Sequence, residues 1–305
     1  MSSARATGEA IRAPSALVTN ACIVVMCLIW GSTWLVIREG LDSVPPYTSA
    51  AVRFLLAGAV MIVLAALFGA KEGGATPATW LWVVLGVTNF AVPYGIVYRT
   101  ETILPSGLVS LLWGIFPMLM ALAGHLYLPG ERLGLAQWLG FVFGFLGLCV
   151  LFLTDLRTLG PEAVPAAMVL FLSPLVAAIG STLVKKYGET TNSLALNRNG
   201  MLLGAVLLGA VAWPTERHAE AHWTTGAVGS VVYLALFGTV LTFGFYFWLL
   251  RYVDAHKLSL ISYVTPAIAL TLGPLVRSEP VTRNTLAGAA CILCGVVLVV
   301  RGKRH

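Results

Sequence analysis

Long apolar runs separated by short polar breaks make up most of the chain. Most are long enough to cross a hydrocarbon core about 30 Å thick as a helix, and they are continuous rather than alternating as in a membrane β-barrel. The breaks contain turn-forming residues such as Pro45-Pro46, Gly73-Gly74 and Gly160-Pro161. The pattern predicts an all-α membrane protein with ten transmembrane helices, at residues 18–37, 47–68, 80–98, 105–127, 134–153, 164–184, 194–213, 227–250, 257–276 and 285–300.

The composition excludes a soluble protein. Of 305 residues, 58% are hydrophobic and only 10% are charged, whereas a soluble domain carries about 25% charged residues. Ten helices of about 20 residues leave about 105 positions for tails and loops, too few for a further domain. The net charge of +6 would suggest nucleic acid in a soluble chain. Here we expect a small-molecule substrate and the lipid bilayer as partners, and no nucleic acid.

Lysine and arginine residues are unequally divided between the two sets of loops. If the N-terminus is cytoplasmic, that side holds Arg5, Arg12, Lys71, Arg132, Lys185, Lys186, Arg251, Lys257, Arg301, Lys303 and Arg304, and the opposite side holds Arg38, Arg99, Arg157, Arg217, Arg277 and Arg283. Because cytoplasmic loops are enriched in these residues, we expect both termini in the cytoplasm of a bacterial inner-membrane protein. Residues 1–17 are then a disordered cytoplasmic tail, and the run at 18–37 is a membrane span rather than a signal peptide, because it is long and lacks a clear small-residue cleavage site.

The chain also repeats itself. At an offset of 149 residues, Gly31-Ser32-Thr33 aligns with Gly180-Ser181-Thr182, Tyr94-Gly95 with Phe243-Gly244, and Pro117 with Pro266; after the loss of one residue, Gly140 aligns with Gly288 and Gly147 with Gly295. Chance similarity of apolar segments would not keep one register over so many glycine, proline and serine positions. The sequence therefore predicts two related halves, 18–154 and 164–301, that together form one transmembrane domain.

Each predicted half has five helices, and because five is odd the second half enters the membrane in the opposite orientation. Such an inverted repeat is common in secondary transporters, where the substrate site lies near the midplane between the halves. The alternative is a duplicated scaffold without transport, such as a membrane enzyme. The pattern favours a transporter that works by alternating access.

The same residues resemble a known family. Trp30-Gly31-Ser32-Thr33-Trp34 and Arg53-Phe54 are similar to the opening of EamA-type members of the drug/metabolite transporter superfamily, and residues 106–117 with 130–133 are similar to its signature in helices 4 and 5. The resemblance covers about residues 20–301. It implies ten helices, cytoplasmic termini and export or facilitated exchange of small metabolites, and it is nearest to YddG-like exporters of aromatic amino acids. In one departure, Pro280 follows Glu279 where the first half has Arg132.

Charged residues are nearly absent from the predicted spans. Between the span ends there is no Asp or Glu, and the basic side chains there are Arg53, Arg198 and His125. A proton- or sodium-coupled carrier usually places carboxylates inside the membrane. We therefore expect facilitated transport, with proton coupling as the alternative. The two arginines fit either snorkelling to the nearer interface or an anchor between halves or for a substrate carboxylate, and His125 fits interfacial packing better than a proton relay.

Aromatic and hydroxyl side chains recur at helical spacing on several spans, as Ser110, Trp113 and Pro117 do on one helix face. They would wall a neutral cavity suited to zwitterionic or aromatic metabolites, although aromatic rings also pack in cores. The candidate substrate-binding residues are Trp30, Ser32, Trp34, Tyr94, Tyr98, Ser110, Trp113, Ser181, Phe243, Tyr246, Ser259 and Tyr263. The candidate hinge or gating residues are Pro93, Pro117, Pro174 and Pro266, each of which removes a backbone hydrogen bond inside a span.

We expect no metal, cofactor or catalytic residue. All five cysteines lie inside apolar runs, and Cys291 and Cys294 have no further metal ligands near them in the sequence. The loop at 214–226 contains Glu216 and two histidines but fits a solvated loop better than a metal site. Glycine pairs spaced by four residues, such as Gly140 and Gly144, allow close helix contacts, and we expect these within a monomer rather than a dimer.

The predicted function is an inner-membrane transporter that exports aromatic and other neutral amino acids, or facilitates their diffusion, through a cavity between the repeats. A nucleotide-sugar carrier would need several basic residues at the cavity, and a carrier of cationic drugs would need a carboxylate. A membrane-embedded enzyme would need a cluster of Asp, His or Lys. The sequence shows none of these, so we expect a transporter that is not an enzyme.

Overall fold

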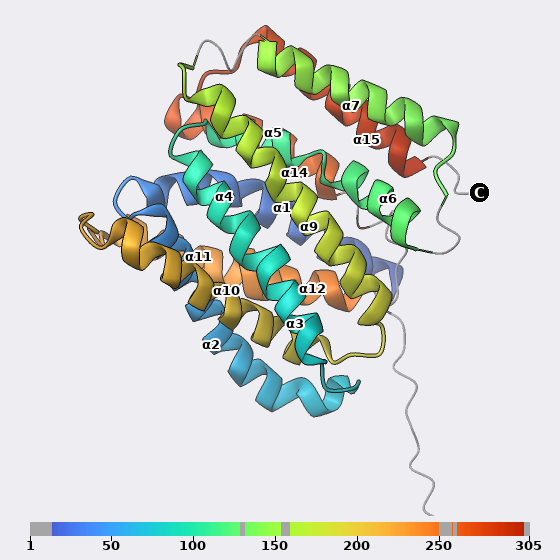
Figure 1. The fold of residues 1–305 in the computed structure, drawn as a ribbon, viewed down its shortest axis with the longest axis vertical. Helices are drawn as coiled ribbons and strands as arrows, with labels where there is room; N and C mark the ends of the chain where they lie inside the picture. Colours follow the sequence, from blue (N-terminus) through green and yellow to red (C-terminus); the bar gives the residue numbers. More distant parts are fainter. Residues whose placement is uncertain (1–13, 129–131, 154–158, 250–257, 259–260, 302–305) are drawn as a thin grey trace, which may run out of the picture.

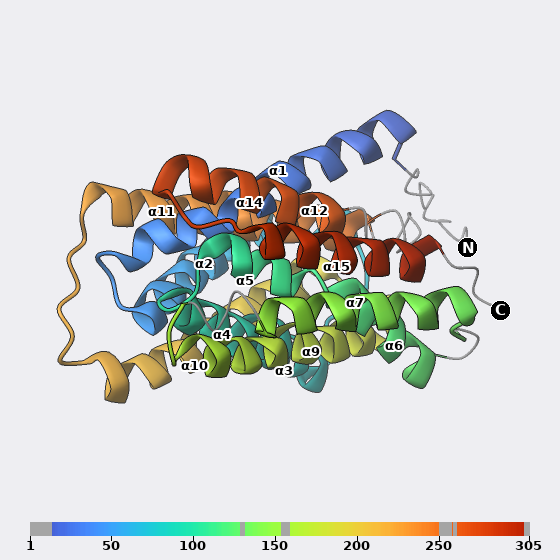
Figure 2. The same ribbon diagram turned by 90° about the horizontal axis from the view of Figure 1, so that it is seen from above.

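The structure is a computed structural model that describes residues 14–128, 132–153, 159–249, 258 and 261–301 (Figure 1). These residues form a bundle of helices that run roughly along a common direction, with irregular turns at both ends (Figures 1 and 2). The helices are α1 (Ala16–Leu41), α2 (Pro46–Glu72), α3 (Thr79–Leu85), α4 (Val92–Glu101), α5 (Ser106–Trp113), α6 (Phe116–Tyr127), α7 (Leu135–Leu153), α9 (Ala163–Tyr187), α10 (Ser193–Glu216), α11 (Thr225–Ala235), α12 (Thr242–Leu249), α14 (Ile261–Arg277) and α15 (Arg283–Arg301). Two π-helical segments, η1 (Gly86–Ala91) and η2 (Leu236–Leu241), connect α3 to α4 and α11 to α12.

The prediction of an all-α membrane protein is confirmed. Seven of the continuous helical segments in the described residues are long and apolar enough to cross a bilayer, and shorter apolar helices lie within α7, α14 and α15. The count of ten spans stays a prediction. Helix starts follow the sequence signals: the side chains of Ser15, Asn192 and Thr224 cap α1, α10 and α11, and proline begins α2.

The turns identify the two ends of the bundle. We call the end with the turn between α1 and α2 the α1–α2 end, and the end with the turn between α2 and α3 the α2–α3 end. At the first, the backbone of His222 donates to that of Ser43. At the second, Ala75 and Thr191 form an isolated bridge. Segments far apart in the sequence therefore meet at both ends.

Helices α7 and α15 pack side by side along one edge of the bundle (Figure 1). A Cβ atom on Gly147 would lie 2.7 Å from the carbonyl oxygen of Gly288, and one on Gly295 would lie 2.5 Å from the carbonyl oxygen of Gly140. In the register of the sequence repeat, Gly140 corresponds to Gly288 and Gly147 to Gly295. The contact of Gly147 with Gly288 and the contact of Gly295 with Gly140 are therefore equivalent positions of the repeat.

The two π-helical segments are also related by the repeat. An offset of 149 carries residues 86–91 onto 235–240, which overlap η2 in all but one position. In the first half, Pro93 follows η1 directly as the second residue of α4. These segments were not predicted from the sequence. π-Helical turns are rare in proteins, and those that exist are frequently found at functional sites.

Helices α2 and α10 are joined by a carboxylate at each end. Glu216, the last residue of α10, accepts hydrogen bonds from the backbone N–H groups of Tyr47 and Thr48 at 2.8 and 2.7 Å. Glu72, the last residue of α2, accepts from those of Ser193 and Leu194 at 3.1 and 3.0 Å. Each carboxylate thus caps the positive N-terminus of the other helix. Placing Glu216 in a solvated loop was wrong, because α10 continues through it.

Two other predicted boundaries differ from the structure. The predicted span 105–127 is interrupted at Gly114 and Ile115, where the N–H of Gly114 donates to both Ser110 and Leu111 and Pro117 follows as the second residue of α6. The predicted span 80–98 continues to Glu101. Arg99 and Glu101 lower the hydropathy of that segment, yet the helix simply runs on, and this brings a carboxylate into the bundle.

Candidate functional site

An aromatic cluster connects the two halves of the chain. The ring of Trp30 on α1 lies 5.6 Å from that of Phe243 and 5.8 Å from that of Tyr246, both on α12. Phe243 in turn meets Phe90 of η1 edge-on at 5.3 Å. The structure therefore brings together three of the predicted site residues and adds Phe90, which lies four positions before Tyr94 in the sequence.

A second part of the cluster forms around Trp113 on α5. Its ring lies 6.2 Å from that of Trp34 and stacks on Phe116 at 5.1 Å. Its indole N–H donates to the hydroxyl of Ser173 at 2.8 Å, and that hydroxyl donates to the carbonyl of Pro93 at 3.1 Å. Side chains from α1, α6 and α9 thus fix the orientation of the Trp113 ring.

Two polar atoms of this part of the cluster have no hydrogen-bond partner among the residues described. They are the indole nitrogen of Trp34 and the hydroxyl oxygen of Ser110, one helical turn before Trp113. Buried polar atoms in native proteins are nearly always paired with protein, water or a ligand. A donor and a hydroxyl beside stacked rings can hold a molecule that has both an aromatic surface and polar groups.

The two serines of the repeated Gly-Ser-Thr motif bond to opposite halves of the chain. Ser32 on α1 and the phenol of Tyr233 on α11 share a hydrogen bond of 2.8 Å. Ser181 on α9 donates to the side-chain carbonyl of Asn89 in η1, also at 2.8 Å. The sequence analysis missed Tyr233 and Asn89; an amide inside an apolar run was the available signal for Asn89.

Arg53 on α2 is almost completely buried, with 1% of its surface exposed. Its Nε donates to the hydroxyl of Thr239 at 3.0 Å, Nη2 donates to the carbonyl of Gly238 at 3.3 Å, and the indole of Trp30 donates to the same carbonyl. Snorkelling to the membrane surface is therefore wrong. Arg53 anchors the first half to η2 of the second half.

Tyr94 and Tyr98, which were predicted as substrate-binding residues, pack against Arg53 and not against the ring of Trp30. The guanidinium carbon lies 4.7 Å from the centre of the Tyr94 ring, and Nη1 donates to the phenol of Tyr98 at 3.3 Å. Tyr98 is fully buried. A π-face and a phenol oxygen stabilise a cation that has no carboxylate in contact with it among the described residues.

The other predicted residues are placed as follows. Pro93 and Pro117 stand at the starts of α4 and α6, whereas Pro174 and Pro266 lie inside α9 and α14. Ser259 and the side chain of Tyr263 lie outside the described residues. His125 accepts a hydrogen bond from the backbone of Leu133 at 3.2 Å, in keeping with packing near the helix end. Within the described part of the chain, no group of three metal-binding side chains occurs.

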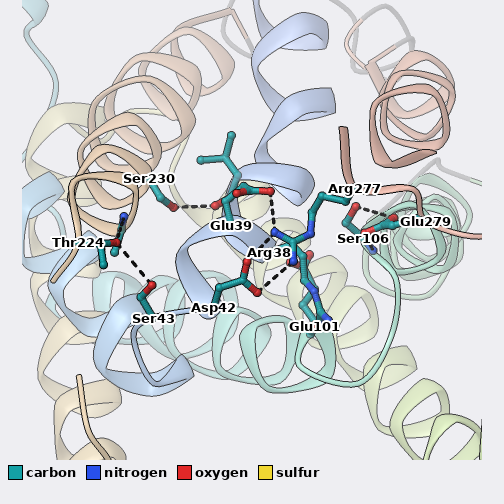
Figure 3. A network of polar contacts seen from close by, with 12 residues as sticks. Arg38, Glu39, Asp42, Ser43, Glu101, Ser106, Thr224, Ser230, Arg277 and Glu279 are labelled. Atoms are coloured by element: carbon teal, nitrogen blue, oxygen red, sulfur yellow. Dashed lines mark hydrogen bonds and ion pairs between the residues drawn. The ribbon is translucent and has the colours of Figure 1, made fainter. Parts of the chain in front are cut away.

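A charged cluster lies at the α1–α2 end of the bundle (Figure 3). Arg277, the last residue of α14, forms ion pairs with Asp42 at 2.6 Å and Glu39 at 2.7 Å, both at the end of α1. A second hydrogen bond of 3.0 Å makes the pair with Asp42 bidentate. We call Arg277, Glu39 and Asp42 the gate, because they hold α14 of the second half against α1 of the first.

Beside the gate, Glu279 fixes the start of α5. Its carboxylate accepts hydrogen bonds from the backbone N–H groups of Ser106 and Gly107 and from the Ser106 hydroxyl, at 2.9 to 3.1 Å. Residues of the turn between α14 and α15 are thus bonded to the first half as well. Figure 3 shows this contact next to Arg277.

Glu101 is the residue that the sequence analysis missed most clearly. It ends α4 and is completely buried, and within the described ranges neither of its carboxylate oxygens has a hydrogen-bond partner. The expectation that no carboxylate lies within the spans was wrong, since the described helix extends three residues beyond the predicted boundary at 98. A lack of carboxylates therefore no longer favours facilitated over proton-coupled transport.

Comparison with known proteins agrees with this architecture. The EamA-like transporter family model matches residues 18–153 and again residues 164–301. The chain is 27% identical over 282 residues to the uncharacterized inner membrane transporter YedA of Escherichia coli K12, covering 92% of this chain and 90% of that protein. It is 24% identical to the uncharacterized transporter YoaV of Bacillus subtilis, covering 90% and 94%, and 27% identical to the protein PecM of Dickeya dadantii, covering 89% and 88%.

A solved crystal structure also has this fold. It matches with a TM-score of 0.67 and 20% identity, covering 93% of this chain and 96% of the other. The family model matches the chain twice, and the two matched ranges correspond to the two halves that the aromatic and ionic contacts hold together. The chain is a multi-pass membrane transporter of the EamA-like transporter family.

Proposed function

We propose that this protein carries neutral, zwitterionic metabolites, with aromatic amino acids as the leading class, across the bacterial inner membrane. The aromatic cluster supports this substrate class. Rings of Trp34, Trp113 and Phe116 offer apolar surface, and the unpartnered atoms of Trp34 and Ser110 offer one N–H donor and one hydroxyl. Among the described residues, no charged side chain forms a hydrogen bond or a cation–π contact with these groups, which favours a cargo without net charge.

The arrangement suits alternating access. The two halves are in contact both inside the bundle and at one of its ends. Inside the bundle, Arg53 and Trp30 of the first half donate hydrogen bonds to η2 of the second half. At the α1–α2 end, the gate joins α14 to α1. A substrate leaving through the α1–α2 end has to separate Arg277 from Asp42. Since both halves come from one chain, a monomer contains everything this movement requires.

The direction of transport follows from the predicted orientation. With both termini in the cytoplasm, the α1–α2 end faces outwards, because α1 starts at the opposite end. The gate then closes the external exit, and export requires it to open. Pro93, Pro174 and Pro266 are proposed bending points of the surrounding helices, and Ser32, Ser181, Phe243 and Tyr246 are proposed to complete the substrate site with Trp30.

Uptake of labelled phenylalanine into proteoliposomes tests this function. Competition with unlabelled Trp, Thr and Met should reduce uptake, whereas a nucleotide should not. The matched control is Trp213→Ala, which removes a ring from the lipid-facing surface of α10 (72% exposed), and it should transport normally. Uptake that resists all amino acids but yields to another metabolite class would overturn the proposed cargo while leaving transport intact.

A further inference from the structure

Glu101 is a carboxylic acid held inside the bundle next to the gate. None of its surface is exposed, and neither carboxylate oxygen has a hydrogen-bond partner in the described part of the chain. Its backbone carbonyl accepts a hydrogen bond from Nη1 of Arg38 on α1. Figure 3 shows Glu101 and Arg38 beside the ion pair of Asp42 and Arg277. The acid therefore lies where α4 meets the end of α1.

The charges around Glu101 come from several elements. Arg38 from α1, Arg53 from α2 and Glu279 from the turn between α14 and α15 act on it electrostatically, and Tyr98 lies one turn earlier on its own helix. Each nearby cation is bonded elsewhere: Arg53 to Thr239, Gly238 and Tyr98, and Arg38 to the backbone. Among the residues that the structure describes, no donor thus contacts the carboxylate oxygens in this arrangement.

An ionised carboxylate without donors is very costly in a low-dielectric interior, whereas the neutral acid is far less so. The closed arrangement consequently suits protonated Glu101. The ionised form needs water or a direct contact with Arg38, and either one requires the end of α4 to move relative to α1. That movement disturbs the helix end on which Glu39 and Asp42 hold Arg277.

We propose that Glu101 is a proton-binding site that controls the gate: the gate is closed while Glu101 is protonated and opens as it loses the proton. On opening, the O–H bond of the acid breaks, the proton passes to water at the α1–α2 end, and the carboxylate becomes hydrated or pairs with Arg38. Reclosing takes one proton back. This inference rests on the proposed function as a transporter and adds a coupled ion to it.

The distance between two spin labels across the gate tests the proposal. In a background without the native cysteines, Ser43→Cys in the α1–α2 turn and Val281→Cys in the α14–α15 turn carry the labels, and the purified protein in nanodiscs is measured over about pH 5–9. The fraction with the longer distance should rise by about tenfold per pH unit below the midpoint, as loss of one proton requires. A fraction that does not change with pH overturns the proposal.

Substitutions at Glu101 test whether this residue, and not another carboxylic acid, is responsible for the pH response of the gate. Glu101→Gln, a neutral isostere, should keep the short distance at every pH, and Glu101→Asp should restore a pH response with a shifted midpoint. The matched control is Glu216→Gln, which changes a carboxylate at the same end that caps α2, and its pH response should match that of the unmodified protein. A normal pH response in Glu101→Gln would overturn the assignment.

Infrared spectroscopy gives a second readout that involves neither labels nor substrate. The difference spectrum between acidic and basic samples should contain the C=O stretching band of a protonated carboxyl, and Glu101→Gln should remove that band. Persistence of the band would assign it to another acid and overturn the proposal. If the gate responds to pH but no amino acid is transported, only the proposed cargo fails; if amino acids are transported without a pH response, only the role of Glu101 fails.

Discussion

Arg277 and Asp42 meet in a bidentate ion pair at the α1–α2 end, with N–O distances of 2.6 and 3.0 Å. The pair joins residues 235 positions apart in the sequence and belongs to opposite halves of the chain. Planar pairing of a guanidinium with a carboxylate fixes orientation as well as distance. The contact therefore determines how α14 sits against α1 when this end is closed.

Asp42→Asn should loosen this closure without unfolding the protein. Exposed ion pairs contribute about 0.2–1 kcal/mol, and Glu39 still contacts Arg277, so we expect the open fraction at fixed pH to rise by no more than about fivefold. The spin-label distance across the gate measures it. Glu220→Gln, which removes an exposed carboxylate that contacts His222, should leave the distance unchanged; an equal shift in both variants would contradict a specific role for Asp42.

Arg53→Lys should lower thermal stability in detergent. Lysine keeps the charge but cannot reproduce the separate bonds to Thr239, Gly238 and Tyr98. Each lost hydrogen bond from a charged group costs about 1.5–3 kcal/mol, so the unfolding temperature should fall by several degrees or more. Arg198→Lys serves as the control, because Arg198 is half-buried and its side chain bonds to the neighbouring Asn199. Equal losses would argue against the anchor.

Gly147→Ala should separate α7 from α15. The added methyl group would lie 2.7 Å from a carbonyl oxygen and from a side-chain carbon of Ile292, and overpacking of this kind costs about 1–3 kcal/mol. Gly209→Ala in α10, where nothing lies within 4 Å of the new atom, should be neutral or slightly stabilising. Thermal unfolding of the two variants compares them directly, and similar unfolding temperatures would disprove the close contact.

Trp113→Ala should reduce transport strongly while leaving membrane insertion intact. The substitution removes the ring between Trp34 and Phe116 and the bond to Ser173; loss of a buried aromatic contact with a ligand costs about 2 kcal/mol or more, or roughly thirtyfold in affinity. Tyr263→Ala, from the second half, should act in the same direction. Proteoliposome uptake checks both, and unchanged uptake in both would remove these residues from the site.

Helix positions were predictable because each apolar run is bounded by turn residues that also end the helices in space. The register of the repeat was predictable because glycines such as Gly147 and Gly288 are required where two backbones touch. The burial of Arg53 was not, since partners such as Thr239 lie on a helix whose position depends on tertiary packing. Glu101 was missed because the hydropathy pattern places the end of a span before the first charged residues. The helix itself continues for as long as its backbone hydrogen bonds do, which is to Glu101.

The two carboxylates that cap the neighbouring helix, Glu72 on α2 and Glu216 on α10, have a mechanical consequence. Sliding α2 along α10 by one helical turn, about 5.4 Å, would pull both carboxylates away from the N–H groups of Tyr47 and Ser193 together. Translation in either direction is therefore opposed at both ends of the helix pair, and we expect the two helices to move as one unit. Conformational change is left to rotations of the remaining helices around this pair, so that distances measured between α2 and α10 provide a fixed internal reference for every other movement.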